Sequence, residues 1–569
     1  MAEYSSGAIY FTGLGNGTDF DSIIEATMTA ESFRLTQLES WRDTWAEKVE
    51  VLQELNTELL ALRTALKAMD TKAEFVTMDV SVSDSSALTV TATGDADVAN
   101  HTVVVGQLAC NDIWVNSATG EASSSDSITD TDATMTYSYG GQEYTIDVPA
   151  GTTLSGLVNI INNNTLSNSG VRAAVLNDGS AYHLQLYGMD QGADNAVAIT
   201  DCSIEGYAPE DFENTQVAKN AWLKVDGYPS GEDQWIERAT NTVTDLLDGL
   251  TLNLRGVSSS GGVSVSVAVD TDAMYETIVS FMDSLNTIYA LIDELTAVSD
   301  EGESVEGSIM TGNYGVDMIK QNLKSITASR ALGFSYYDEA TGSGDLFTSL
   351  AQIGIVTDTD ESSETFGMLV LDTDPGAGLT LIQALAEDPL AVADLFVADN
   401  EGVSMSSDFG HVSNISGITE PGDHEVAYEI SGGAIIAATI NGEAATVSGN
   451  SITGAAGTAA AGMVLQVHTM DDGSYTGTVR IKQGTIAEMV ASLANITDSE
   501  SGILNIIADN YQTIVDNTEK RIAEEEARLE LKERTLRTMY AKLEATLSSY
   551  ESLDTSLDSL IDQLPSTSS

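Results

Sequence analysis

The chain has 569 residues, a length that predicts roughly three to five domains at about 100 to 200 residues per domain. It carries 87 Asp and Glu against 23 Lys and Arg, a formal net charge of −64. A surface of this sign repels phosphate backbones and anionic lipid, which excludes nucleic acid and membrane-surface partners. Hydrophobic residues make up 42% of the chain, too large a share for a wholly disordered polypeptide. We therefore expect several folded domains.

The opening of the sequence, MAEYSSGAIYFTGLGNGTDF, has no basic region followed by an apolar run, so we expect no Sec signal peptide. No stretch of about 18 consecutive apolar residues occurs either, which predicts no membrane span. The two cysteines, Cys110 and Cys202, exclude a multi-disulfide framework and a C-x-x-C site. One bridge between them stays open as an alternative.

Apolar residues at steps of three and four predict a long helix with a coiled-coil seam near the N-terminus. A shorter helix through Ile23 and Met28 precedes it, with Thr18 and Asp21 as its capping residues. One position of the seam is skipped, at Lys48. The seam residues are Leu38, Trp41, Trp45, Leu52, Leu55, Leu59, Leu62, Leu66 and Met69.

Alternating small and β-branched residues indicate that the middle of the chain is rich in strands. Cationic residues gather near the chain ends, six in residues 1–72 and seven in 516–544, whereas residues 331–479 contain no Lys or Arg. The predicted strand regions are 76–108, 135–148, 171–175, 182–187, 222–225, 250–254 and 263–269, with an amphipathic helix at 154–161 and a further β-rich stretch at 411–482.

A mid-chain helix is predicted after an N-cap at Asp272. Its apolar face consists of Met274, Ile278, Phe281, Leu285, Ile288, Ile292 and Leu295. Such a face needs helical partners, so we expect this helix to pack with parts of both terminal helices while the β domains project from the bundle.

The C-terminal helix is predicted from apolar residues spaced by seven. They are Val515, Ile522, Leu529, Leu536, Leu543, Tyr550, Leu557 and Leu564, with Met539, Leu553 and Leu560 on the second seam position. The i,i+4 pairs Glu524/Arg528, Glu530/Arg534 and Glu533/Arg537 add only a few tenths of a kcal/mol each. The residues we expect to contact other subunits or a filament are Leu536, Leu543, Tyr550, Leu553, Leu557 and Leu560. An intramolecular helical hairpin in a monomer is the alternative.

Together these elements predict an α+β multidomain fold, with a helical bundle or coiled coil built from both chain ends and a mid-chain helix, and with projecting β-rich domains. The expected boundaries are 1–40 for a flexible N-terminal segment and terminal helix, 41–75 with 271–400 and 484–515 for a helical leg, 76–115 with 215–270 for a β domain, 116–214 for an outer β domain, 403–483 for an extra β module, and 516–569 for a C-terminal coiled coil.

Patterns for catalysis or metal binding are weak. Neither H-E-x-x-H, G-x-S-x-G nor a P-loop occurs. Gly13, Gly15 and Gly17 lack the third glycine of a dinucleotide loop and indicate a hinge. Asp358 and Asp360 alternate as in a calcium loop, but its sixth position is not glycine, which favours a solvated turn. The histidines stand singly and predict surface or partly buried side chains: His101, His183, His411, His424 and His468. We expect no catalytic residue, metal or cofactor.

Several segments, in order along the chain, resemble the flagellar filament cap family, also called hook-associated protein 2 or FliD. GLGNGTDFDSIIEATMTAE is similar to the opening of that family, and YGGQEYTIDVPAGTTLSGLVNIINNN begins a repeat similar to one that the family shares with flagellins. The resembling segments are residues 13–31, 139–188, 222–254, 272–292, 349–358, 387–396 and the terminal coiled coil. The sequence DTDESSETFGMLVLD and the extra module depart from the usual pattern of the family.

This resemblance implies a structural, non-catalytic protein at the distal tip of the bacterial flagellar filament. There a homo-oligomeric ring would promote flagellin polymerisation, prevent flagellin leakage and support motility. The implied partners are further copies of the chain, flagellin, hook–filament junction proteins and an export chaperone. The implied location is extracellular, reached through the flagellar type III channel, and the outer domain 116–214 is expected to be flagellin-like. The alternative functions are a surface adhesin that binds a host or substrate through its β domains, and a hook–filament junction protein.

Overall fold

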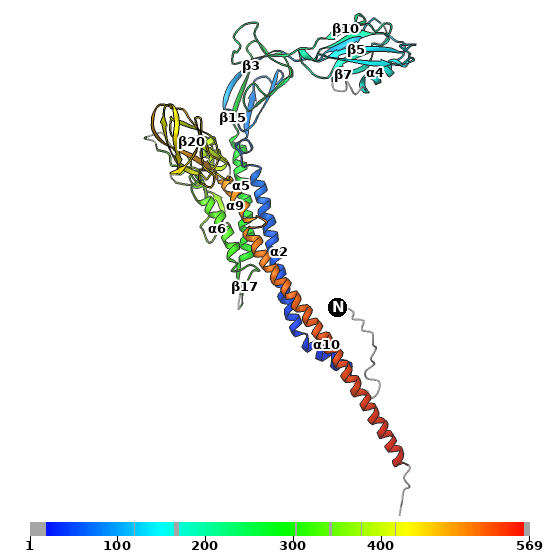
Figure 1. Cartoon of the computed structure of the whole chain (residues 1–569), viewed down its shortest axis with the longest axis vertical. Coiled ribbons are helices and arrows are strands. Elements are labelled where there is room, and N and C mark those ends of the chain that lie inside the picture. Colours follow the sequence, from blue (N-terminus) through cyan, green and yellow to red (C-terminus); the bar gives the residue numbers. More distant parts are fainter. Residues whose placement is uncertain are drawn as a thin grey trace, which may run out of the picture.

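The computed structural model describes residues 19–118, 120–163, 170–301, 304–338, 340, 344–376, 378–415 and 417–562. The molecule is elongated: a helical leg carries β domains at one end and at its side (Figure 1). Helices from both ends of the chain run side by side away from these β domains. This arrangement confirms the predicted α+β multidomain fold.

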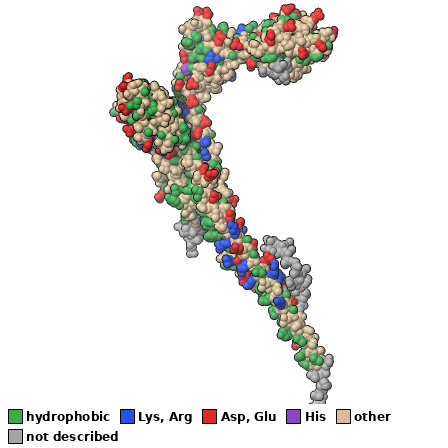
Figure 2. All heavy atoms as spheres, viewed as in Figure 1, with side chains coloured by type: hydrophobic (Ala, Val, Ile, Leu, Met, Phe, Trp, Pro, Cys, Tyr) green, Lys and Arg blue, Asp and Glu red, His purple; other side chains and the backbone are tan. Residues whose placement is uncertain are grey.

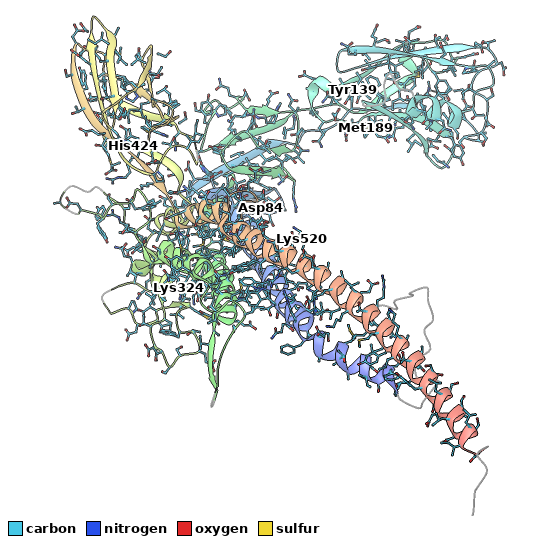
Figure 3. All side chains as sticks on the ribbon, turned by 60° about the horizontal axis from the view of Figure 1, so that its bottom comes forward. Asp84, Tyr139, Met189, Lys324, His424 and Lys520 are labelled. Atoms are coloured by element: carbon cyan, nitrogen blue, oxygen red, sulfur yellow. The ribbon has the colours of Figure 1, made fainter. Side chains whose placement is uncertain are left out.

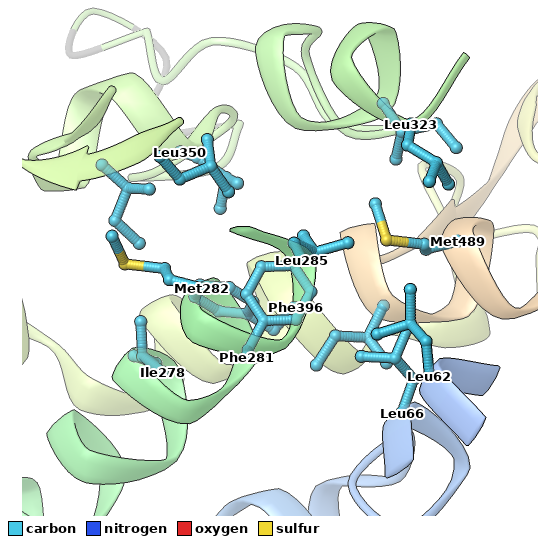
Figure 4. Packing of buried hydrophobic residues seen from close by; sticks show 14 of the residues in the cluster. Leu62, Leu66, Ile278, Phe281, Met282, Leu285, Leu323, Leu350, Phe396 and Met489 are labelled. Carbon is cyan, nitrogen blue, oxygen red and sulfur yellow. The ribbon is translucent and has the colours of Figure 1, made fainter. Parts of the chain in front are cut away.

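The helical leg is held together by one hydrophobic core that collects residues from three distant stretches of the chain, 52–76, 274–398 and 486–504. Its elements are α2 (Phe33–Lys67), α3 (Lys72–Phe75), α5 (Thr271–Thr296), β16 (Val298–Glu301), β17 (Ser304–Gly307), α6 (Tyr314–Ala328), β18 (Ile355–Thr357), β19 (Leu369–Leu371), α7 (Leu381–Glu387), α8 (Pro389–Val397) and α9 (Thr485–Ile496). Phe396 stacks on Phe75 with ring centroids 5.2 Å apart and meets Phe281 edge-on at 5.6 Å. Leu62 and Met489 belong to the same core (Figure 4).

The helix caps differ slightly from the prediction. Asp270 rather than Asp272 caps α5, because its carboxylate accepts a first-turn backbone N–H at 2.9 Å. Asp272 lies inside the first turn, where a negative charge still favours the helix dipole. In α1 (Phe20–Glu31) the cap is Asp19, which accepts the Ser22 N–H at 3.0 Å. The predicted cap residue Thr18 lies outside the described residues.

The β domain next to the leg has two antiparallel sheets. One has the order β1 (Met78–Val82), β15 (Val263–Val269), β3 (Ala99–Gln107), β11 (Ala221–Val225) and β12 (Ile236–Arg238), and the other β13 (Thr242–Val243), β14 (Leu250–Leu254) and β2 (Leu88–Ala92). Val103, Leu223, Leu252 and Val265 are buried in its core. Since β1 follows α3 and β15 precedes α5, the chain enters and leaves this domain through two paired strands.

The outer β domain is inserted between β3 and β11 and has its own core, which includes Tyr137, Leu157 and Leu186. One sheet has the order β10 (Phe212–Gln216), β4 (Ile113–Asn116), β8 (Tyr182–Gly188) and β7 (Val171–Asn177), and the other β6 (Gln142–Val148), β5 (Ala133–Tyr139) and β9 (Val197–Cys202). The helix α4 (Leu154–Asn163) packs on β7. The predicted strands at 135–148, 171–175 and 182–187 and the predicted helix are confirmed, whereas β4, β9 and β10 were not predicted.

A buried carboxylate lies where the two connecting segments enter the outer domain. Asp112 is 1% exposed. Its oxygens accept hydrogen bonds from the Trp114 indole, the Asn214 amide and the backbone N–H groups of Val197 and Ala218, at 2.8 to 3.0 Å. Because the donors come from three separate segments, β4, the start of β9 and residues 214–218, this satisfied carboxylate ties the base of the domain together.

The extra module follows α8 and precedes α9. Its sheets have the orders β20 (Asp399–Ser404), β28 (Gly473–Gln483), β22 (Gly422–Ser431), β23 (Ala434–Ile440), β24 (Glu443–Ala444), and β21 (Phe409–Ser413), β27 (Val464–Val467), β26 (Ser451–Thr453), β25 (Thr446–Ser448). Phe409, Tyr428, Ile452 and Leu465 lie in a core that is separate from that of the leg. We call residues 403–483 the inserted module.

Cys110 and Cys202 are both free thiols, so the bridge that the sequence left open is not formed. Burial raises the pKa of the Cys202 thiol.

Among the described helices, none has both the length and the apolar character that crossing a membrane requires.

Replacing Phe396 by Ala is expected to destabilise the leg by about 3–5 kcal/mol, because it removes a buried ring that contacts two others. Hydrogen exchange read by mass spectrometry would measure this as faster exchange in α5 and α9. The matched variant Phe409→Ala should accelerate exchange in the inserted module instead. Equal acceleration of both regions by either variant would contradict the separate cores.

Candidate assembly surface

The helix α10 (Ile503–Ile561) is a single helix of 59 residues. It begins in the leg core at Leu504 and continues beyond the other described helices (Figure 1). Val515, Ile522 and Leu529, spaced by seven, are buried in its first half, where α2 runs along it. The seam predicted for this half is confirmed by their burial, and α10 continues unbroken through the expected boundary at residue 515.

The N-terminal seam is confirmed at Leu38 and in its later part and is wrong at one tryptophan. Leu52, Leu55, Leu59, Leu62 and Leu66 are buried. Trp45 packs edge-on against Tyr511 of α10 with ring centroids 4.8 Å apart, so it already fills the seam there. Trp41 instead lies against the outer side of Trp45 at 5.6 Å and is 52% exposed. Val49 is buried beside the skipped position at Lys48.

A feature that the seam pattern did not predict is that α1 folds back along α10. The ring of Phe20 stacks on Tyr540 at 5.3 Å, and Asp21 forms an ion pair with Arg537 at 3.2 Å. The other end of α1 lies beside Arg528, so the two helices are antiparallel. Among the described residues, α1 therefore covers α10 as far as Tyr540.

An ion network joins α1 to α10. Arg528 binds Glu525 at 2.8 Å and Glu31 at 3.1 Å, and Lys532 lies 3.6 Å from Glu31. Hydrogen bonding to Arg528 lowers the pKa of both carboxyl groups, and the two carboxylates raise the pKa of the guanidinium. The sequence predicted Glu524 as the partner of Arg528, but Glu525 forms the ion pair instead. Glu525 lies on the buried face of α10, next to α1.

The other two predicted pairs are confirmed. Arg534 binds Glu530 at 2.9 Å and Arg537 binds Glu533 at 2.8 Å. Both pairs are substantially exposed to solvent. Exposed pairs of this kind contribute little to stability, so covered apolar side chains hold α10 in place.

Beyond Tyr540 the apolar seam of α10 is exposed in the part of the chain that the structure describes (Figure 2). Leu536 is still half-buried. The later predicted contact residues are exposed: Leu543 by 43%, Tyr550 by 65%, Leu553 by 61%, Leu557 by 57% and Leu560 by 62%. Leu564 lies outside the described residues. The predicted site residues thus lie along one helix face that is available for contact.

The same helix segment is acidic. After Lys542 the sequence contains no Lys or Arg, while Glu551, Asp554 and Asp558 border the apolar seam. Tyr550, Leu553 and Leu557 line a shallow hollow together with two of these carboxylates. A surface of this kind combines an apolar centre with an acidic border, which is typical of a helix that is covered in an assembly.

The acidic stretch at Asp358 and Asp360 forms a turn between β18 and β19. Asp358 accepts the Asp360 N–H at 2.9 Å and the Thr365 hydroxyl at 2.6 Å, and Asp360 accepts the Ser362 hydroxyl at 2.6 Å. These hydrogen bonds lower the pKa of both aspartates. The carboxylates are therefore occupied within the turn. No group of three or more potential metal ligands occurs among the described residues.

One histidine differs from the expectation. His424 is 2% exposed inside the inserted module (Figure 3). Its Nδ1 accepts from the Asn441 amide at 2.9 Å, and its Nε2 donates to the Glu420 carbonyl at 2.8 Å. Both ring nitrogens are satisfied, so this is a structural histidine. The glycine-rich segment with Gly13 and Gly15 lies outside the described residues.

Comparison with known families identifies the architecture. The family model for the C-terminus of flagellar hook-associated protein 2 matches residues 218–552, more than half of the chain. The chain belongs to the flagellar hook-associated protein 2 family. The N-terminal model of the family matches residues 16–112, and a flagellin hook IN motif matches residues 134–188. The resemblance to hook-associated protein 2 and its flagellin-like repeat is confirmed.

Individual members of the hook-associated protein 2 family are distant in sequence. The flagellar hook-associated protein 2 of Escherichia coli is 27% identical over 418 residues, which cover 70% of this chain and 82% of that protein. The Aquifex aeolicus protein is 25% identical over 347 residues, covering 59% and 74%. The crystal structure of the D1-D2-D3 domains of the flagellar cap protein FliD from Escherichia coli shares 26% identity at a TM-score of 0.49, covering 62% of this chain and 91% of that one.

The Arg528→Gln variant is expected to weaken the packing of α1 on α10 at pH 7. The pKa values of Glu31 and Glu525 are lowered in the folded chain, so the stability that they contribute is present above their ordinary value of 4.5 and is lost as the pH falls through the lowered values. The difference in thermal midpoint between wild type and variant, followed by circular dichroism, should therefore shrink from pH 7 to pH 3.

The control for this prediction is Arg534→Gln, which removes an exposed pair within α10 and should change the midpoint less. A difference in thermal midpoint between wild type and Arg528→Gln that stays constant from pH 7 to pH 3 would contradict a contribution of the ion network to stability.

Proposed function

We propose that this chain caps the distal tip of the bacterial flagellar filament as a closed homo-oligomer that promotes flagellin polymerisation and prevents flagellin leakage. Membership of the hook-associated protein 2 family carries this conclusion. The role is structural rather than catalytic, and loss of the protein should shorten filaments and impair motility.

The exposed end of α10 supports assembly on physical grounds. Exposure of the apolar side chains Tyr550, Leu553, Leu557 and Leu560 to water costs free energy, which is recovered when another surface covers this helix face. A filament tip is a tubular lattice, and subunits that contact one another head to tail must close into a ring to avoid growing as fibres. We infer that these residues, with Leu536 and Leu543, contact neighbouring copies or the filament end.

The wider set of partners follows from the same proposal. Flagellin is the protein whose assembly the cap guides, and hook–filament junction proteins form the base on which the first cap sits. An export chaperone would cover the apolar end of α10 before secretion through the flagellar type III channel. The protein then acts outside the cell, at the filament tip.

Family membership favours the cap over the adhesin, because the family models match on both sides of the outer β domain and into the terminal coil as far as residue 552. A deletion strain separates the two functions. Loss of a cap releases unpolymerised flagellin into the medium, whereas loss of an adhesin leaves filaments intact. Labelled protein at the distal tip, and not at the hook, separates a cap from a junction protein.

Placing two charges in the apolar seam of α10, in the variant Leu553→Asp/Leu557→Asp, is expected to weaken self-association at least about a hundredfold, because assembly would bury unpaired carboxylates. Light scattering and sedimentation would measure the oligomer. Flagellin in the culture medium would report loss of capping, while the β signal in circular dichroism should be unchanged.

The matched control is Ser552→Asp/Ser559→Asp, which adds the same charges to the opposite face of α10. The turn variant Asp358→Asn/Asp360→Asn should also leave capping unchanged. Normal oligomers and swimming in the seam variant, with defects in either control, would show that function has been assigned to the wrong surface.

A further inference from the structure

The inserted module carries an unusual distribution of positive charge. Between Arg330 and Lys520 the sequence contains only two cationic residues, Arg480 and Lys482. Both lie near the end of β28 and are two positions apart, so their side chains leave the same face of the sheet. The intervening Ile481 is fully buried in the module core. Both positive charges of this long acidic stretch therefore lie on one outward face.

That face is covered by residues 332–335 and Asp345, which lie between α6 and β18 and which we call the leg segment. Lys482 forms an ion pair with Asp345, and its Nζ lies 5.1 Å from the centre of the Phe334 ring. The two charged side chains are only 16% and 10% exposed. Asp345 also accepts the Ser335 N–H at 2.8 Å, which holds the leg segment in shape. An ion pair shielded to this extent is screened much less by salt than one at the surface.

Arg480 makes a second connection. Its guanidinium binds Asp423 of the neighbouring strand β22 through two hydrogen bonds of 2.6 and 2.9 Å. This bidentate contact orients the side chain so that its third nitrogen donates to the Ser335 hydroxyl of the leg. The arginine thus links two strands of the module to the leg segment.

Backbone contacts place the leg segment directly on β28. The Gln483 N–H donates to the Leu332 carbonyl at 2.9 Å, and the Gly484 N–H donates to the Ala398 carbonyl at 2.7 Å. Gly333 has a φ of +77°, and a Cβ at this position would overlap the Ile481 carbonyl. A glycine is therefore required for this close approach.

We propose that Arg480 and Lys482 form an electrostatic anchor that fixes the inserted module in one orientation on the helical leg. The module is joined to the leg through two adjacent strands, β20 and β28, which alone would act as a hinge. The anchor adds side-chain contacts between the leg segment and the outward face of β28, and these contacts prevent rotation about that hinge. The module is accordingly a rigid side arm of the subunit and not a tethered domain. This inference does not depend on the capping role.

Distances between spin labels test the anchor in the full-length chain. The labels replace the exposed residues Ser448 in the module and Glu58 on α2, in a Cys110→Ser/Cys202→Ser background. We expect a narrow distance distribution in this parent, at low salt and at 1 M NaCl. The Arg480→Gln/Lys482→Gln variant should broaden it at least about twofold. The control Lys520→Gln/Lys542→Gln removes two cations from α10 and should leave it narrow.

A charge reversal separates loss of the anchor from unfolding of the module. The variant Asp345→Lys/Lys482→Asp restores an opposite pair at the same place, and it should narrow the distribution relative to Lys482→Asp alone. A broad distribution in the parent, an unchanged one in the Arg480→Gln/Lys482→Gln variant, or no recovery in the charge-reversed pair would each overturn the proposal.

Discussion

The contact among three phenylalanine rings in the leg determines how the rest of the molecule is arranged. Phe75 ends the segment that leads into the first β domain, and Phe281 lies on the helix that follows it. Phe396 lies in the last turn of the helix before the inserted module, and Met489 lies on the helix after it. Each β excursion thus begins and ends at the same core. Burial of these rings offsets the entropy that closing two long excursions costs.

Acidic and cationic residues are distributed differently over the molecule. The β domains carry an excess of like charge, which disfavours contact between them, whereas several cationic residues lie where segments meet. Arg528 joins the first helix to the last, and Lys482 joins the inserted module to the leg. Many carboxylates surround each positive side chain in so acidic a chain. The ion pair that forms is the one with the nearest shielded carboxylate, because the Coulomb attraction is strongest at short distance and away from water.

The sequence predicted the long elements well and the contacts between them less well. Periodicity specifies a helix face, so the seams through Leu59 and Ile522 and the exposed residues from Leu543 onward could be identified before any coordinates. Periodicity does not show which other residues pack against that helix face. Trp41 follows the seam yet stays exposed, because Trp45 already occupies the space against Tyr511. The fold-back of α1 could not be predicted, since it depends on contacts between residues 497 and 516 positions apart. Two aspartates near the start of α5 fit the capping pattern equally, and the backbone conformation alone decides between them.

The unbroken course of α10 has a mechanical consequence. At about 1.5 Å per residue, its 59 residues span about 89 Å. One end is embedded in the leg core at Leu504, while the other presents Leu557 and Leu560 to solvent. A rod of this kind contains no joint that could absorb a displacement. A force or twist applied at the far end therefore acts on the leg core, from which the first β domain and the inserted module extend.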